Sequence, residues 1–217
     1  LVMFWSNMKK QQILIAASKL FMGLGYGVVS MEQVAREANV SKATLYAHFK
    51  SKNDLFVAML NHYQQVEQIR FPQLPEAIAA NLNELHAVML SYIQMAYDYY
   101  TAESVVCLYR LLISEIQQFP ELFELFFGRN SAGLTNSLAK YLQSYAEQQA
   151  SPEPCFNLAC QILDLVRGAS IWTKLVQNPA KQYLIEQPEL AVRQLQHSCQ
   201  LLVDDHFSSS NLKVTKF

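Results

Sequence analysis

Residues 30–55 read SMEQVAREANVSKATLYAHFKSKNDL, and this stretch decides the fold around it. Ser30 lies three residues before Gln33, the spacing of a helix-opening capping box, which predicts a helix over 31–38. Ser41 is a second N-cap candidate and predicts a helix over 42–48, after a tight turn. Ser51, with an acidic residue three positions later, marks a third start. The stretch therefore predicts two short helices joined by a turn, with another helix directly after them.

Two short helices in this arrangement form a helix-turn-helix, whose second helix enters a DNA major groove. Apolar residues fall on an inward face: Val34, Ala35, Val40, Leu45 and Phe49. An ordinary helical corner with solvated polar residues is the alternative, but three start signals in register with that face favour DNA binding. The residues expected to contact DNA are Ser30, Ser41, Lys42, Ala43, Thr44, Tyr46, His48 and Lys52.

These side chains have different expected roles. Lys42 and Thr44 can hydrogen-bond base edges or phosphates, and Ala43 can touch a thymine methyl group. The polar tips further along the helix suit the DNA backbone. Lys52 lies in the first turn of the next helix, where its charge and the free backbone N–H groups would hold a phosphate.

The segment before the motif predicts another helix. One helical face carries Ile13, Ala16, Ala17, Leu20, Phe21 and Leu24. Gly23, Gly25 and Gly27 then end the helix and turn the chain. A glycine-rich phosphate loop is the alternative, but it should follow a strand and open directly into a helix. Because this cluster follows a helix, a helix end and a turn are favoured.

Residues 9–63 resemble the N-terminal domain of TetR-family transcriptional regulators. The resemblance rests on ILIAASKLFMGLGY at 13–26 and VSKATLYAHFKSKNDLF at 40–56, which place Tyr46, Phe49, Lys52 and Leu55 as the family motif does. Val29 and Ala43 depart from the Thr and Gly frequent in the family. The resemblance implies a three-helix DNA-binding head, a larger all-helical body that binds ligand and dimerises, and repression relieved by a small molecule.

The whole chain is expected to be all-α, with about nine helices. The DNA-binding domain should span 1–63, with its fourth helix over 52–71 ending at Pro72 and Pro75. A ligand-binding and dimerisation domain over 76–207 and a tail over 208–217 should follow. The fifth helix should begin between residues 76 and 83 and end at 100. Two more are expected over 103–118 and over 121–149, the second with an interruption at 128–133. The last two are expected over 155–177 and 188–207.

A second resemblance covers part of the body. The segment RLLISEIQQFPELFELFF, residues 110–127, is similar to the C-terminal domain of AcrR-like and AefR-like members of the family. Taken by its residues alone, the segment predicts an amphipathic helix, a proline stop and an aromatic-rich second helix.

Composition and charge bound the class of protein. The 217 residues are 51% hydrophobic and 16% charged, as in a folded globular protein. Residues 1–60 hold seven Lys and Arg against three Asp and Glu, whereas the rest holds ten against fifteen. A weakly basic head on an acidic body predicts salt-dependent DNA binding that needs two heads. Without a signal-peptide core or a membrane-length apolar run, we expect a cytoplasmic protein.

An enzyme is not expected. The sequence shows no nucleophile–base pair, no paired carboxylates in a polar cleft and no metal-ligand spacing, and we expect no cofactor. Cys107, Cys155, Cys160 and Cys199 contain no C-x-x-C pair, which favours reduced thiols over a metal or redox site. A DNA-binding protein that organises the chromosome without sensing a ligand remains the alternative function.

The last two helices are expected to form a dimer interface. Ile162, Leu163, Leu165 and Val166 are nearly consecutive, and small residues follow at 168–170. The final helix adds Leu195, Cys199 and Leu202 at near-heptad spacing. We expect a two-fold homodimer through a four-helix bundle, and hence a palindromic operator. Burial of both helices within one monomer is the alternative.

Aromatic residues of the body are expected to line an effector pocket. The candidates are Tyr92, Tyr99, Tyr109, Phe123, Phe127 and Trp172. Buried Tyr and Trp need partners for their polar atoms, and an apolar cavity with a few polar tips is the usual small-molecule site. The effector should be a small hydrophobic molecule, aromatic or cationic. Rings that simply fill the core are the alternative for each residue.

Overall fold

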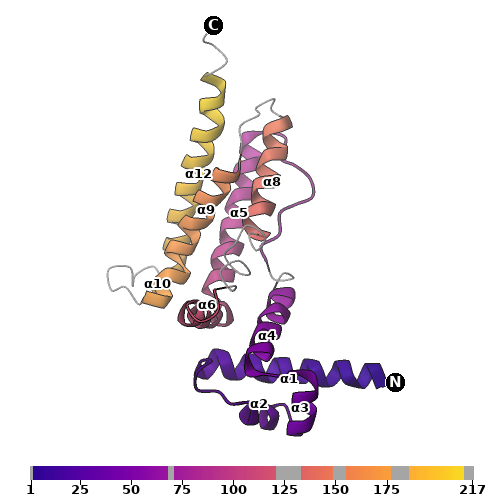
Figure 1. Ribbon diagram of the computed structural model, residues 1–217. Coiled ribbons are helices and arrows are strands. Elements are labelled where there is room, and N and C mark those ends of the chain that lie inside the picture. Colours follow the sequence, from indigo (N-terminus) through magenta and orange to yellow (C-terminus); the bar gives the residue numbers. More distant parts are fainter. Residues whose placement is uncertain (1, 68–70, 121–132, 149–154, 177–185, 213–217) are drawn as a thin grey trace. The chain divides into compact units, whose positions relative to one another are not determined.

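The computed structural model describes residues 2–67, 71–120, 133–148, 155–176 and 186–212 (Figure 1). Every regular element in these ranges is an α-helix, which confirms the all-α prediction. Contacts divide the chain into two compact units: a head unit of residues 1–70 and 107–120, and a body unit of residues 71–106 and 121–217. Among the described helices, none combines the length and apolar character needed to span a membrane.

The head unit begins with four helices. They are α1 (Val2–Leu24), α2 (Met31–Glu37), α3 (Lys42–His48) and α4 (Lys52–Glu67). Helix α1 packs against α4 and α2, and α2 packs against α3 (Figure 1). Gly25 ends α1 with a φ of +88°, a left-handed conformation that favours glycine. The glycine cluster is thus a helix end and a turn, as predicted.

The three helix starts read from the sequence are present. Each serine Oγ accepts a hydrogen bond from the backbone N–H three residues later, which satisfies one of the free donors of a helix N-terminus. Gln33 also returns its side chain to the N–H of Ser30 and completes the capping box. Between α2 and α3 the chain turns at Asn39, whose φ is +50°. The three N···O distances are 3.2 Å for Ser30–Gln33, 3.0 Å for Ser41–Thr44 and 3.0 Å for Ser51–Asp54.

Apolar side chains from all four helices form the core of the head. Phe21, Leu45, Leu55 and Phe56 are completely buried, and Phe49 is 4% exposed. Burial of each large apolar side chain stabilises the fold by about 1.5–3 kcal/mol. The helix-turn-helix is therefore held by its inward residues, which leaves its other face to solvent.

Helix α6 (Glu103–Glu115) contributes to both units, because the head unit includes the chain from Cys107 to Pro120. The helix was expected to continue to residue 118 but ends at Glu115. Pro120 cannot continue a helix, because it has no backbone N–H to donate. The chain continues in a turn, in which the Phe119 N–H donates to the Glu115 carbonyl at 2.9 Å. The sequence analysis divided the chain into consecutive domains and did not predict that residues 107–120 belong to the head unit.

The body unit is a bundle of longer helices. It contains α5 (Leu82–Thr101), α8 (Gly133–Gln148), α9 (Phe156–Ala169), α10 (Ile171–Val176) and α12 (Pro188–Leu212). Helix α9 packs against α5, α8 and α12, and α12 also packs against α5 (Figure 1). Ile162, Leu163 and Val166 of α9 are completely buried by these contacts.

Several helix boundaries differ from the predictions. The single helix expected over 155–177 is broken at Ser170, whose φ and ψ are −106° and −87° and whose hydroxyl donates to the Val166 carbonyl at 2.5 Å. Such a side-chain bond competes with helical hydrogen bonding. The last helix continues past residue 207 to Leu212, because serine weakens a formed helix only slightly. The fourth helix was expected over 52–71, but Phe71 is not helical, because a residue directly before a proline disfavours the helical conformation. Of the interruption expected at 128–133, residues 128–132 lie outside the described residues, and Gly133 begins α8.

Candidate DNA interface and body sites

Helix α3 presents its predicted DNA-contacting side chains to solvent. Ser41, Lys42, Ala43 and Tyr46 are exposed. Thr44 and His48, on the same helix, are half-buried, as are Ser30 at the start of α2 and Lys52 at the start of α4. The Thr44 hydroxyl lies 2.9 Å from the Ser41 hydroxyl, so the capping interaction also orients a predicted base contact.

Lys42 is paired in the structure. Its Nζ lies 2.8 Å from a carboxylate oxygen of Glu32, and this hydrogen bond lowers the pKa of Glu32. Both side chains are exposed, so the ion pair is weak. A DNA phosphate or base edge near Lys42 would therefore compete with Glu32, a residue that sequence reasoning did not connect with the interface.

Lys52 has an aromatic neighbour that the sequence did not reveal. Its Nζ lies 4.2 Å from the centroid of the Tyr26 ring and 3.5 Å from the Gly27 carbonyl oxygen. Partial burial lowers the pKa of Lys52, and the negative charge of Glu115 acts in the opposite direction. Nothing in the spacing of Tyr26 and Lys52 along the chain indicates their contact.

In the body, Tyr92 is completely buried on α5. Its hydroxyl has no hydrogen-bond partner among the described residues. Burial is also the main reason why the pKa of Tyr92 is raised, with a smaller contribution in the same direction from Tyr100 and an opposing one from Arg167. A buried hydroxyl without a partner is uncommon, because its desolvation is not offset by a hydrogen bond.

The other aromatic candidates are not brought together in the described part of the body. Tyr99 is half-buried, with its ring 5.2 Å from that of Phe71. Tyr109 lies in the segment of α6 that belongs to the head unit. Trp172 is 46% exposed on α10, whereas the sequence analysis treated its ring as buried. The remaining two, Phe123 and Phe127, lie outside the described residues.

A small pocket of about 220 Å³ lies at the break between α9 and α10. Its lining includes Thr101, Ser170 and Lys174. The polar atoms of these residues already bond within the protein: Lys174 Nζ donates to the Thr101 carbonyl at 2.5 Å, and the Thr101 hydroxyl donates to the Tyr97 carbonyl at 2.8 Å. Sequence reasoning missed this pocket because it predicted an unbroken helix there.

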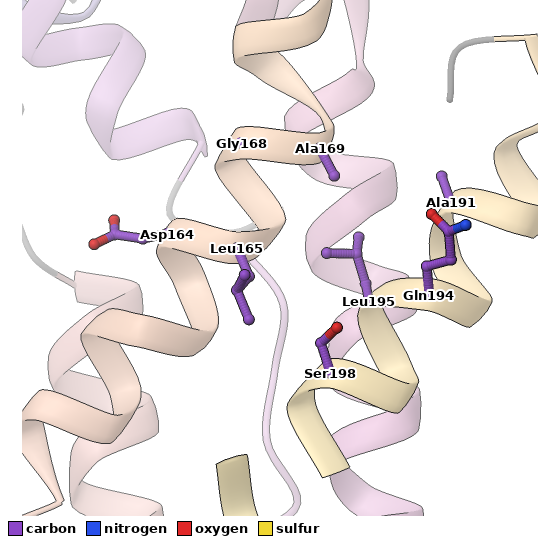
Figure 2. A pocket seen from close by; sticks show the side chains of 8 residues that line it. All are labelled: Asp164, Leu165, Gly168, Ala169, Ala191, Gln194, Leu195 and Ser198. Carbon is purple, nitrogen blue, oxygen red and sulfur yellow. The ribbon is translucent and has the colours of Figure 1, made fainter. Parts of the chain in front are cut away.

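A surface groove of about 260 Å³ is lined by residues of α9 and α12 (Figure 2). Leu165 and Ala169 line it from α9, and Leu195 and Ser198 line it from α12. Leu165 is 40% exposed, although its neighbours Leu163 and Val166 are fully buried. Part of the apolar surface of α9 is thus used within the body, and Leu165 remains outside it. Within the described ranges, no cluster of His, Cys, Asp and Glu could hold a metal ion.

Two family models match the chain. The model described as "Bacterial regulatory proteins, tetR family" matches residues 13–59, and "AefR-like transcriptional repressor, C-terminal domain" matches residues 83–194. The first match spans the second half of α1, all of α2 and α3, and the first half of α4; the second begins in α5 and ends in α12. Together they cover both the head and the body.

Curated relatives match mainly over the head. The transcriptional activator FasR of Mycolicibacterium smegmatis is 44% identical over 55 residues, which are 25% of each chain. The regulator QacR of Staphylococcus aureus is 29% identical over 91 residues, or 42% of this chain and 47% of QacR. The match thus spans only a quarter of FasR and about half of QacR.

Solved structures match over nearly the whole chain. The Flavonoid-responsive Regulator FrrA has a TM-score of 0.68 at 25% identity, covering 92% of this chain and 97% of FrrA. A TetR-family regulator of Mesorhizobium loti has a TM-score of 0.65 at 20% identity, covering 94% and 97%. These matches show the same fold in head and body.

Proposed function

Because this chain belongs to the TetR family of bacterial transcriptional regulators, we propose that it is a ligand-responsive DNA-binding regulator of transcription. In this proposal it represses genes from a palindromic operator and leaves the operator when a small hydrophobic molecule binds. Members of the family are regulators rather than enzymes. Its target is chromosomal DNA, and we propose that it acts in the cytoplasm.

The match of the body favours a repressor with an effector over a protein that only organises the chromosome. Residues 83–194 match a repressor domain, whereas the relative that is an activator is similar over only 55 residues. The proposed division follows this evidence, with DNA binding by residues 1–63 and effector binding and dimerisation by residues 76–207. In the sequence, helix α4 is the last helix of the proposed DNA-binding part and precedes the proposed effector-binding part.

The outward face of α3 is the observation that carries the DNA-binding proposal. Leu45 is completely buried on one side of this helix, while Lys42, Ala43 and Tyr46 are exposed on the other. A helix of this kind fits the major groove, with its first residues at the base edges. Ser30, His48 and Lys52 would hold the phosphates on either side.

Replacement of Lys52 by Ala tests this docking. We expect the affinity for all DNA sequences to fall about tenfold and the slope of log K against log salt concentration to fall by about one unit per head. Lys140→Ala, which removes an exposed lysine of α8, is the matched control and should change neither quantity. Thr44→Ala should instead alter base preference. Wild-type affinity and salt slope in both Lys52→Ala and Thr44→Ala would contradict the docking, as measured by fluorescence anisotropy.

We also propose a two-fold homodimer through α9 and α12 of each chain. Leu165, which lines the groove between these helices, is 40% exposed, and Leu201, also on α12, is 56% exposed. At Gly168 there is open space where a side chain would stand, so a neighbouring helix can approach the backbone. A second copy would bury these residues in a four-helix bundle.

The effector site proposal rests on Tyr92. Its buried hydroxyl, without a partner in the described part of the chain, is a donor that a ligand could satisfy. Tyr99 and Trp172 belong to the same unit as Tyr92 and remain proposed ligand residues, as do Phe123 and Phe127, which lie outside the described residues. The effector would be a small aromatic molecule with a hydrogen-bond acceptor, a class that includes the flavonoids to which the structurally similar FrrA responds.

The Tyr92→Phe variant measures whether this hydroxyl is free in the ligand-free protein. Removal of a buried group without a partner should raise the free energy of unfolding by about 1 kcal/mol. Tyr141→Phe is the matched control: its buried hydroxyl accepts from Ala79 N–H at 3.1 Å and donates to the Ala77 carbonyl at 3.3 Å. Tyr141→Phe should therefore destabilise the protein by a similar amount. Equal destabilisation by both variants, in urea titrations, would exclude Tyr92 as an available donor.

A further inference from the structure

Tyr26 occupies a central place in the head unit. It lies in the turn after α1, and only 5% of its surface is exposed. Its ring packs 4.6 Å from that of Phe56 and 5.6 Å from that of Phe21, measured between centroids. The hydroxyl donates to Asn53 Oδ1 in the first turn of α4. The ring is therefore fixed on several sides.

One face of this fixed ring carries the ammonium group of Lys52. The 4.2 Å distance from Nζ to the ring centroid is within the range of a cation–π interaction. Lysine has a long flexible side chain, and it loses conformational entropy when a phosphate fixes it. A ring that holds the ammonium group before DNA arrives removes part of that loss.

The end of α6 supports the same ring. Phe119, which is 3% exposed, packs edge-on against Tyr26 at 5.1 Å and at a tilt against Phe56 at 5.2 Å, measured between ring centroids. Burial raises the pKa of Tyr26, and the charge of Glu115, at the last turn of α6, adds to this effect; burial lowers the pKa of Lys52, and Glu115 opposes that change. Its negative charge thus favours the charged form of the lysine. Tyr26 contacts both a predicted phosphate ligand and a segment far away in the sequence.

We propose that Tyr26 is a positioning residue for DNA binding, which holds the Lys52 ammonium group toward a DNA phosphate and is itself held by Phe119. This inference rests on the proposed contact between Lys52 and DNA. It adds a residue that does not touch DNA, and it makes the end of α6 part of the structure on which the phosphate contact depends.

A double-mutant cycle with Lys52→Ala tests the positioning role. Tyr26→Leu keeps an apolar side chain but removes the aromatic face, so the affinity for an operator duplex should fall about threefold. The same change in the Lys52→Ala background should have no further effect on affinity. Tyr26→Phe keeps the ring and loses only the bond to Asn53, so affinity and salt slope should stay at wild-type values while stability falls.

Three outcomes overturn the inference. Equal loss from Tyr26→Leu with and without Lys52 would show a purely structural role. Loss of affinity in Tyr26→Phe as large as in Tyr26→Leu would show that the hydroxyl matters and not the ring. Wild-type affinity and salt slope in Lys52→Ala alone would remove the phosphate contact, and the proposed docking with it.

A second measurement needs no Tyr26 variant and stays decisive if Tyr26→Leu fails to fold. The Lys52 ε-methylene protons, assigned by comparison with Lys52→Ala, should show an upfield ring-current shift in the wild-type NMR spectrum. The shift should persist when an operator duplex is added, because the ring holds the lysine in the complex. Loss of the shift on DNA binding would mean that Tyr26 releases Lys52, which contradicts the inference.

Discussion

Replacement of Leu165 by Glu should convert the protein from a dimer into a monomer and lower its affinity for an operator at least about 100-fold. Leu165 is 40% exposed beside the groove between α9 and α12 (Figure 2). Two-fold symmetry would bring two copies of the new carboxylate into one apolar interface, where their desolvation is not offset. Loss of the dimer removes the gain from binding two heads at once, which is about 100-fold or more.

Met95→Glu is the matched control for this prediction. Met95 is 37% exposed on α5 and does not line the groove, so the same charge there should leave the dimer intact. Sedimentation equilibrium gives the mass, and anisotropy gives the affinity. A Leu165→Glu variant that stays dimeric with wild-type affinity would place the interface elsewhere.

Replacement of Phe56 by Ala should lower the free energy of unfolding by about 3–5 kcal/mol. Phe56 is completely buried on α4, with its ring 5.4 Å from Phe21, 4.6 Å from Tyr26 and 5.2 Å from Phe119. The cavity would remove contacts from three rings at once. Because domains are stable by only about 5–15 kcal/mol, a large fraction of their stability would be lost.

Phe156→Ala makes the same chemical change at a surface site. Phe156 is 43% exposed at the start of α9, so its loss should cost less than about 1 kcal/mol. Urea titrations followed by far-UV circular dichroism compare the two variants. Equal midpoints for Phe56→Ala and Phe156→Ala would show that the aromatic cluster does not stabilise the head.

The fold of the head could be predicted almost completely from local sequence. The bounds of α3 follow from Ser41 as N-cap and from the change of pattern after His48. The left-handed turn after α1 follows from Gly25, since few other residues adopt a φ of +88° without strain. Such features depend on residues within one or two turns of each other, which a sequence displays directly.

Helix boundaries that depend on tertiary context were harder to predict from the sequence. The break at Ser170 has no proline or glycine at the position itself, and it depends on a hydroxyl bond to the Val166 carbonyl. The end of α12 was placed too early because three consecutive serines resemble a loop in composition. A helix already formed over many residues extends through serine at small cost.

Long-range contacts at the candidate sites could not be predicted. Tyr26 and Phe119 are far apart in the sequence, and only folding of α6 onto the head brings their rings to 5.1 Å. Trp172 was predicted as a pocket residue from its type, yet its exposure depends on the break that starts α10. Residue type and helical face thus identified the solvent-exposed side chains of α3 better than the interior of the body.

Selection of duplexes from a random pool by the purified protein tests the proposed function most directly. Helix α3 reading the major groove from both chains of a dimer predicts enrichment of one sequence with two inverted half-sites. Their centres should lie about one helical turn, or a multiple of it, apart. Failure to enrich any sequence, or enrichment of a single half-site without its inverted copy, would contradict sequence-specific binding by a two-fold dimer.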